Sequence, residues 1–130
     1  MLRYLITILL FAHGVGHLLF LANSFGYWKG SEVGRSWLFS GVLGAGQVLE
    51  GLFGLLWLLP LTGFVGVSWG YLTQAGWWPQ LALASAAISV VMIVLWWGSL
   101  VPGSAFFALV FDLAVIVVVL WQLRSGAVLS

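Results

Sequence analysis

Long apolar segments alternate along this chain with short stretches rich in glycine, proline or charged residues. A helix of about 20 apolar residues is long enough to cross the hydrocarbon core of a bilayer. Three segments meet this requirement without ambiguity, which predicts at least three transmembrane helices. The segments fall at residues 4–22, 79–98 and 105–123, and the breaks between them fall at residues 23–36, 75–79 and 101–104.

Residues 37–78 form a fourth apolar region that is too long for one straight span. One interpretation gives two spans joined by a tight turn at residues 60–63, which makes five spans in all. The other gives one span from about residue 50 to residue 73, kinked at Pro60 and preceded by an interfacial or re-entrant helix at 37–48. We favour the second interpretation and a four-span protein.

The first span has one competing interpretation, because Arg3 followed by an apolar core is also typical of a cleaved signal peptide. Two histidines inside the core and the lack of an A-x-A site after it favour a membrane helix. With four spans, both termini lie on the same side, which we expect to be cytoplasmic.

Composition identifies the solvent of this chain as lipid. Hydrophobic residues make up 63% and charged residues 5%, whereas a soluble domain carries about 25% charged residues. We therefore predict an all-α fold, a polytopic transmembrane helix bundle with residues 1–130 as a single domain. The net charge of +1 gives no footprint for nucleic acid, and the absence of cysteine excludes disulfides, thiolate metal sites and cysteine nucleophiles.

Four ionisable residues fall inside the apolar segments: His13, His17, Glu50 and Asp112. Placing an ionisable side chain in the bilayer interior is unfavourable in free energy, so each of the four is a candidate functional residue. His13 and His17 are one helical turn apart and project from one face. In the four-span arrangement, His13 and Asp112 lie at the same depth, with His17 and then Glu50 nearer to the loop at 23–36.

Several kinds of site fit these residues. His13, His17 and Asp112 could bind a divalent metal such as zinc, iron or manganese. The same groups could relay protons, or one histidine could ligate a haem or a pigment. His13 paired with Asp112 could also be a buried polar clasp that only fixes helix register. The zincin mechanism is excluded because the chain has no HExxH.

Residues 5–19, with the signature His13-Gly14-Val15-Gly16-His17-Leu18, resemble the first helix of small bacterial membrane proteins of the DoxX-like group. The stretches at 54–59, 63–72 and 77–78 and the last span with Asp112 are similar to later parts of such proteins. The resemblance implies a four-helix protein of the bacterial inner membrane. It also implies an accessory or structural subunit of a larger redox or energy-transducing complex, or a homo-oligomer. A binding role for the histidine pair is the rival expectation.

Overall fold

The computed structural model describes residues 1–25, 35–44, 46–100 and 103–126, and this part of the chain is helical without any strand. The all-α prediction is therefore confirmed. A short π-helix, η1, precedes the second span, and a single 3-10 turn, η2, lies within that span. The elements are α1 (Leu2–Ser24), η1 (Trp37–Val42), α2 (Gln47–Gly54), η2 (Leu55–Trp57), α3 (Leu58–Leu72), α4 (Trp78–Leu95) and α5 (Ser104–Ser125).

In the part of the chain that the structure describes, four helices are long and apolar enough to cross a membrane, which makes this a small integral membrane protein. The second of them runs without a break through α2, η2 and α3 and contains Pro60 near its middle. Proline has no N–H, and its ring disfavours the regular helical bond to the preceding turn. The backbone forms the tighter 3-10 turn η2 just before Pro60, and the helix then continues in the same direction as α3. The four-span prediction is confirmed. The spans are Leu2–Ser24, Val48–Leu72, Trp78–Leu95 and Ser104–Ser125.

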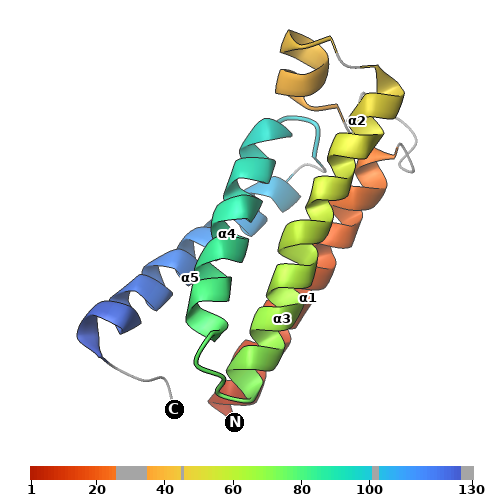
Figure 1. The fold of residues 1–130 in the computed structure, drawn as a ribbon. Coiled ribbons are helices and arrows are strands. Elements are labelled where there is room, and N and C mark those ends of the chain that lie inside the picture. Colours follow the sequence, from red (N-terminus) through yellow and green to blue (C-terminus); the bar gives the residue numbers. More distant parts are fainter. Residues whose placement is uncertain (26–34, 45, 101–102, 127–130) are drawn as a thin grey trace.

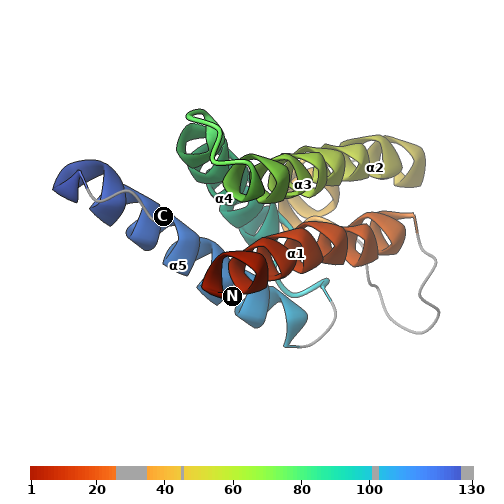
Figure 2. The same ribbon diagram turned by 90° about the horizontal axis from the view of Figure 1, so that it is seen from below.

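The helices pack in the spatial order α1, α3, α4, α5 (Figures 1 and 2). Within the described residues, the backbones of α1 and α5 have no comparable contact with each other. Both views show the C-terminal half of α5 turning away from α1 and α3. The first and last described residues lie at the same end of the bundle, as four spans require.

Two apolar cores lie one above the other along the bundle. The core near the termini contains Leu10, Phe64, Val67, Tyr71, Ala82, Ala86 and Val119. The core near the opposite end contains Phe20, Trp57, Met92, Ile93, Trp96 and Leu100. The buried side chains between these two groups are His17 on α1 and Ser89 on α4, so a polar layer separates the two cores.

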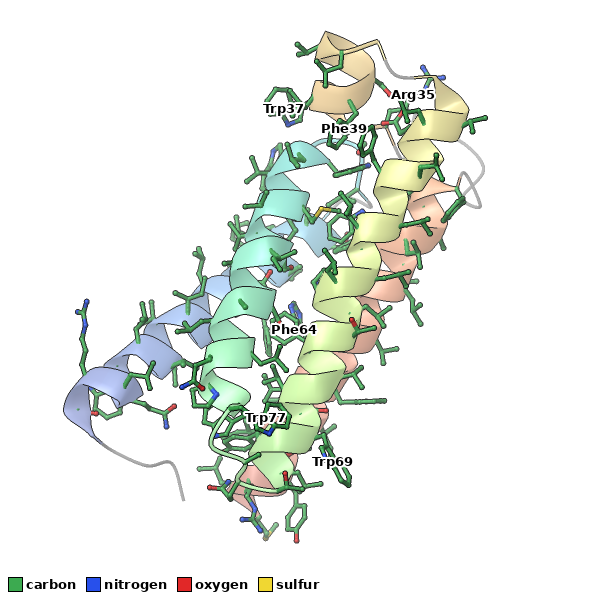
Figure 3. All side chains as sticks on the ribbon, viewed as in Figure 1. Arg35, Trp37, Phe39, Phe64, Trp69 and Trp77 are labelled. Atoms are coloured by element: carbon green, nitrogen blue, oxygen red, sulfur yellow. The ribbon has the colours of Figure 1, made fainter. Side chains whose placement is uncertain are left out.

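The short π-helix η1 covers the end of the bundle that is opposite the termini. The Ser36 hydroxyl donates to the carbonyl oxygen of Leu95 over 2.7 Å, and the indole N–H of Trp37 donates to that of Val94 over 2.7 Å. Both carbonyls belong to the last turn of α4, and that of Val94 also accepts from the backbone N–H of Trp97. Figure 3 shows Trp37 and Phe39 at this end and Trp69 and Trp77 at the other. The expected interfacial or re-entrant helix at 37–48 is thus present in a shorter form.

Glycines allow the helices to approach closely beside the polar layer. A Cβ on Gly14 would lie 2.9 Å from the Cβ of Phe64, and one on Gly63 would collide with the side chain of Ser85. Small residues of this kind let membrane helices reach van der Waals contact. Gly16 is different, because a Cβ there would meet nothing within 4 Å.

Gly14→Ala should therefore destabilise the bundle, whereas Gly16→Ala should not. The added methyl group of Gly14→Ala must push α1 away from α3, which we expect to lower the free energy of unfolding by about 1–3 kcal/mol. Thermal unfolding in detergent, followed by tryptophan fluorescence, would measure both variants. Equal melting temperatures for the two variants would contradict the close α1–α3 contact.

Candidate functional site

The polar layer between the two cores brings together side chains from three spans. His13 and His17 come from α1, Ser89 from α4 and Asp112 from α5. His17, Ser89 and Asp112 are fully or almost fully buried, and His13 is partly buried. The spacing of four residues between the histidines places both rings on one face of α1, where their centroids are 4.9 Å apart.

His13 and Asp112 form a direct polar link between α1 and α5. The distance from His13 Nε2 to Asp112 Oδ1 is 2.7 Å, and the Asp112 side chain is 0% exposed. The other oxygen, Oδ2, has no hydrogen-bond partner among the described residues. The carboxylate therefore keeps one unused ligand or acceptor atom in a region without bulk water.

Aromatic rings hold the His13 imidazole in position. Phe111, next to Asp112 on α5, stacks on it with centroids 4.2 Å apart. Phe64 from α3, visible in the middle of the bundle in Figure 3, meets it edge to face at 4.6 Å. These contacts restrict the ring to an orientation in which Nε2 faces Asp112.

Hydrogen bonds also determine the tautomer of His17. Its Nδ1 lies 2.9 Å from the carbonyl oxygen of His13, and a carbonyl can only accept, so Nδ1 carries the proton and donates. In the neutral ring Nε2 then has the free lone pair, and it accepts from the Ser89 hydroxyl at 2.8 Å. That lone pair is the atom of His17 that can bind a metal ion.

A groove of about 410 Å³ opens beside the two histidines, between α1 and α5. It runs from His13 and His17 to Phe20 on α1 and Ser104 on α5. Ser104 is the first residue of α5, and Phe20 is one turn from the end of α1. The groove therefore runs from the polar layer towards the start of α5, away from the end of the bundle that holds the termini.

Three of these residues could hold a metal ion. One ligand atom each from His13, His17 and Asp112 can be chosen so that all three lie within 4.8 Å of one another. Two imidazole nitrogens and one carboxylate oxygen form a donor set that zinc, iron and manganese accept. The groove leaves space on the open side for water or another ligand to complete the coordination shell.

Glu50 does not join this cluster. It is buried at the start of α2, where its carboxylate accepts hydrogen bonds from the Ser36 backbone N–H and the Ser40 hydroxyl. Gly54 lies against Ser24 at the end of α1, and Glu50 is one further turn outward. Its role in the structure is to attach η1 to the second span.

Ser89 is a site residue that sequence reasoning did not single out. The chain gave one signal, a stripe of small residues on α4 formed by Ala82, Ser85, Ala86 and Ser89, which share a helical face. In the structure all four are buried, and Ser89 is the one that contacts His17. A stripe of small residues indicates a helix contact but does not tell which hydroxyl meets an imidazole.

Replacing His13 or Asp112 by alanine should destabilise the bundle, and the two effects should not add. In the double variant the second replacement lowers the free energy of unfolding by less than it does alone, because the first replacement has already removed the hydrogen bond. We expect a coupling free energy of about 1–2 kcal/mol, the upper range for interhelical hydrogen bonds in membranes. Reversible unfolding in mixed micelles would measure it. Asp112→Ala combined with Thr62→Ala, whose hydroxyl bonds only within its own helix, should be additive.

The comparisons with known proteins leave the site to be interpreted from its own chemistry. The resemblance of residues 5–19 to DoxX-like proteins stays a prediction, since none of the comparisons bears on it. No protein-family model, no curated protein and no solved structure matches this chain.

Proposed function

We propose that this integral membrane protein binds a divalent transition-metal ion between α1 and α5, with His13, His17 and Asp112 as ligands. The observation that carries the proposal is the convergence of these three side chains from two helices within 4.8 Å. A clasp alone would need only His13 and Asp112. The second imidazole on the same face and the adjoining groove support a binding site.

The ligand atoms are available without rebuilding the bundle. His17 Nε2 is engaged only by the Ser89 hydroxyl, which can rotate away to free the lone pair. Asp112 offers Oδ2, which has no partner among the described residues. His13 must exchange its bond to Asp112 for the metal, or bind through Nδ1 while Nε2–H continues to donate to the carboxylate.

Charge also favours a cation at this position. Asp112 is the one carboxylate of the polar layer, and it has no arginine or lysine within ion-pair distance in the described part of the chain. A buried carboxylate in a membrane is stabilised by a cation, and a metal ion compensates the charge more fully than a neutral imidazole does. The groove gives an ion a path from the membrane surface near Ser104.

Metal analysis of the purified protein, supplied in turn with zinc, manganese and ferrous iron, tests the proposal. We expect one ion per chain, and an affinity that falls at least about tenfold in His13→Ala, His17→Ala and Asp112→Asn. Ser89→Ala should bind the metal at least as tightly as the unmodified protein, because the Ser89 hydroxyl competes with the metal for His17 Nε2. Glu50→Gln is the matched control, a buried carboxyl group outside the cluster.

Two results would overturn the metal proposal. One is a protein that takes up none of the three ions. The other is uptake that persists in the ligand variants at the level of Glu50→Gln. In either case the His13–Asp112 contact would be a polar clasp, and its effect on stability would be its whole contribution.

A second candidate function, an accessory subunit of a larger complex in the bacterial inner membrane, is favoured by the exposure of α5. Only 11% of the most apolar stretch of α5 is buried, compared with 33% in each of the two preceding spans. Val117 and Trp121 on this helix are 65% and 61% exposed. The DoxX-like resemblance supports a redox-linked complex, and a partner helix could cover this face.

Because the chain contains no cysteine, cross-linking from single positions can test the subunit proposal. A photo-cross-linker attached to Val117→Cys in native membranes should give one discrete adduct of higher mass. The same reagent on Ile8→Cys, on the exposed face of α1, should give none. Equal adduct patterns from the two positions would contradict a partner on α5.

A further inference from the structure

A second groove, separate from the histidine site, opens between α1 and the diverging half of α5. Its volume is about 250 Å³, and it is lined almost entirely by apolar side chains. It lies towards the end of the bundle that holds the termini, where Figures 1 and 2 show α5 turning away. Phe111 lines both grooves and divides them. Among the lining residues are Ile6, Leu10, Tyr71, Ala82, Val118 and Gln122.

Gln122 is the feature of this groove that points to a ligand. Its side chain is 6% exposed, and its Oε1 has no hydrogen-bond partner among the described residues. A buried amide oxygen without a donor is unfavourable, and the surrounding apolar side chains cannot supply one. Gln122 is three residues from the end of α5, so it lies about 4.5 Å below the helix end, close to headgroup depth.

A positive charge lies at the same mouth of the groove. Arg3 precedes Ile6 by three residues and therefore shares its face of α1. Its guanidinium group lies 5.9 Å from the centroid of the Tyr4 ring. Within the described residues Arg3 forms no ion pair. The end of the groove near the termini thus has a cation on α1 and a hydrogen-bond acceptor on α5.

We propose that this groove binds a phospholipid with an anionic, hydroxyl-bearing headgroup, namely phosphatidylglycerol. The phosphate pairs with Arg3, a glycerol hydroxyl donates to Gln122 Oε1, and one acyl chain follows the groove towards Phe111. Residues 111–122 of α5 cover about 16 Å, close to the roughly 15 Å of one leaflet. The groove therefore has the length of a single acyl chain.

Native mass spectrometry of the delipidated full-length protein, titrated with defined lipids, tests this site. Phosphatidylglycerol should bind about fivefold better than phosphatidylcholine, the ratio expected from one basic residue near the headgroup. It should also bind better than phosphatidylmethanol, which carries the same charge but no hydroxyl donor. Arg3→Gln should remove the preference for phosphatidylmethanol over phosphatidylcholine, which depends on charge alone. Gln122→Leu should instead remove the preference for phosphatidylglycerol over phosphatidylmethanol, which depends on the hydroxyl group alone.

A matched pair on α5 tests the groove itself. Val118 lines the groove, and its neighbour Val117 is 65% exposed and does not. Val118→Phe should abolish the bound lipid, whereas Val117→Phe should retain it. Ala114→Phe, at a second lining position, repeats the test if Val118→Phe disturbs folding as judged by circular dichroism.

The lipid proposal fails if phosphatidylglycerol and phosphatidylcholine bind equally well to the unmodified protein. It also fails if Val118→Phe and Ala114→Phe, while folded, retain as much lipid as Val117→Phe. Either result would mean that lipid covers this surface only as unspecific surrounding solvent. The lipid proposal is tested separately from the metal proposal, because Arg3, Gln122, Val118 and Ala114 are not among the proposed metal ligands.

Discussion

The fold depends on satisfying a fully buried carboxylate inside an apolar bundle. Asp112 has no exposed atom and lies on a helix that is otherwise almost wholly apolar. In a membrane no water is at hand to solvate such a group, so a protein partner must do it. His13 is that partner, and its ring is fixed by Phe111 and Phe64. One contact thus sets the register of α5 relative to α1.

The same requirement explains why the polar groups form a layer. His17 satisfies both of its nitrogens, one on the His13 carbonyl and one on Ser89. With these bonds α1 is tied to α4 as well as to α5. Apolar cores close the layer on both sides. Because interhelical hydrogen bonds contribute only modestly in membranes, their main effect here is to select one helix arrangement among several of similar packing energy.

The helices α1 and α3, and likewise α3 and α4, pack more closely than α1 and α5 do. Gly14 lets α1 approach α3, and Gly63 lets α3 approach α4, so these pairs pack closely. At Gly16, which lines the groove between α1 and α5, a Cβ would meet nothing within 4 Å. The bulky side chains of Phe107 and Phe111 take part in that boundary instead. The two helices therefore meet through side chains around Asp112, and space remains on both sides of that contact.

Much of this arrangement could be predicted from the sequence because it depends on local pattern. Lengths of apolar runs gave three spans directly, and helical spacing placed His13 and His17 on one face. The region around Pro60 stayed ambiguous, since a proline ends a helix in water but is accommodated in a membrane span when the preceding turn tightens. Ser89 and Glu50 show the limit more clearly. Their partners depend on how far α2 extends beyond α1 and on how α4 is rotated, and neither is encoded in the spacing of one segment.

The grooves could not be predicted because they result from the tilt of a whole helix. α5 is a continuous helix of 22 residues held to α1 near Asp112, with one groove on each side of that point. For a stiff rod held at an intermediate point, a change of tilt widens one groove as it narrows the other. Phe111 stacks on His13 and lines both grooves, so any such movement also changes the surroundings of the imidazole. The position of α5 therefore determines both the geometry of the histidine site and the width of the apolar groove.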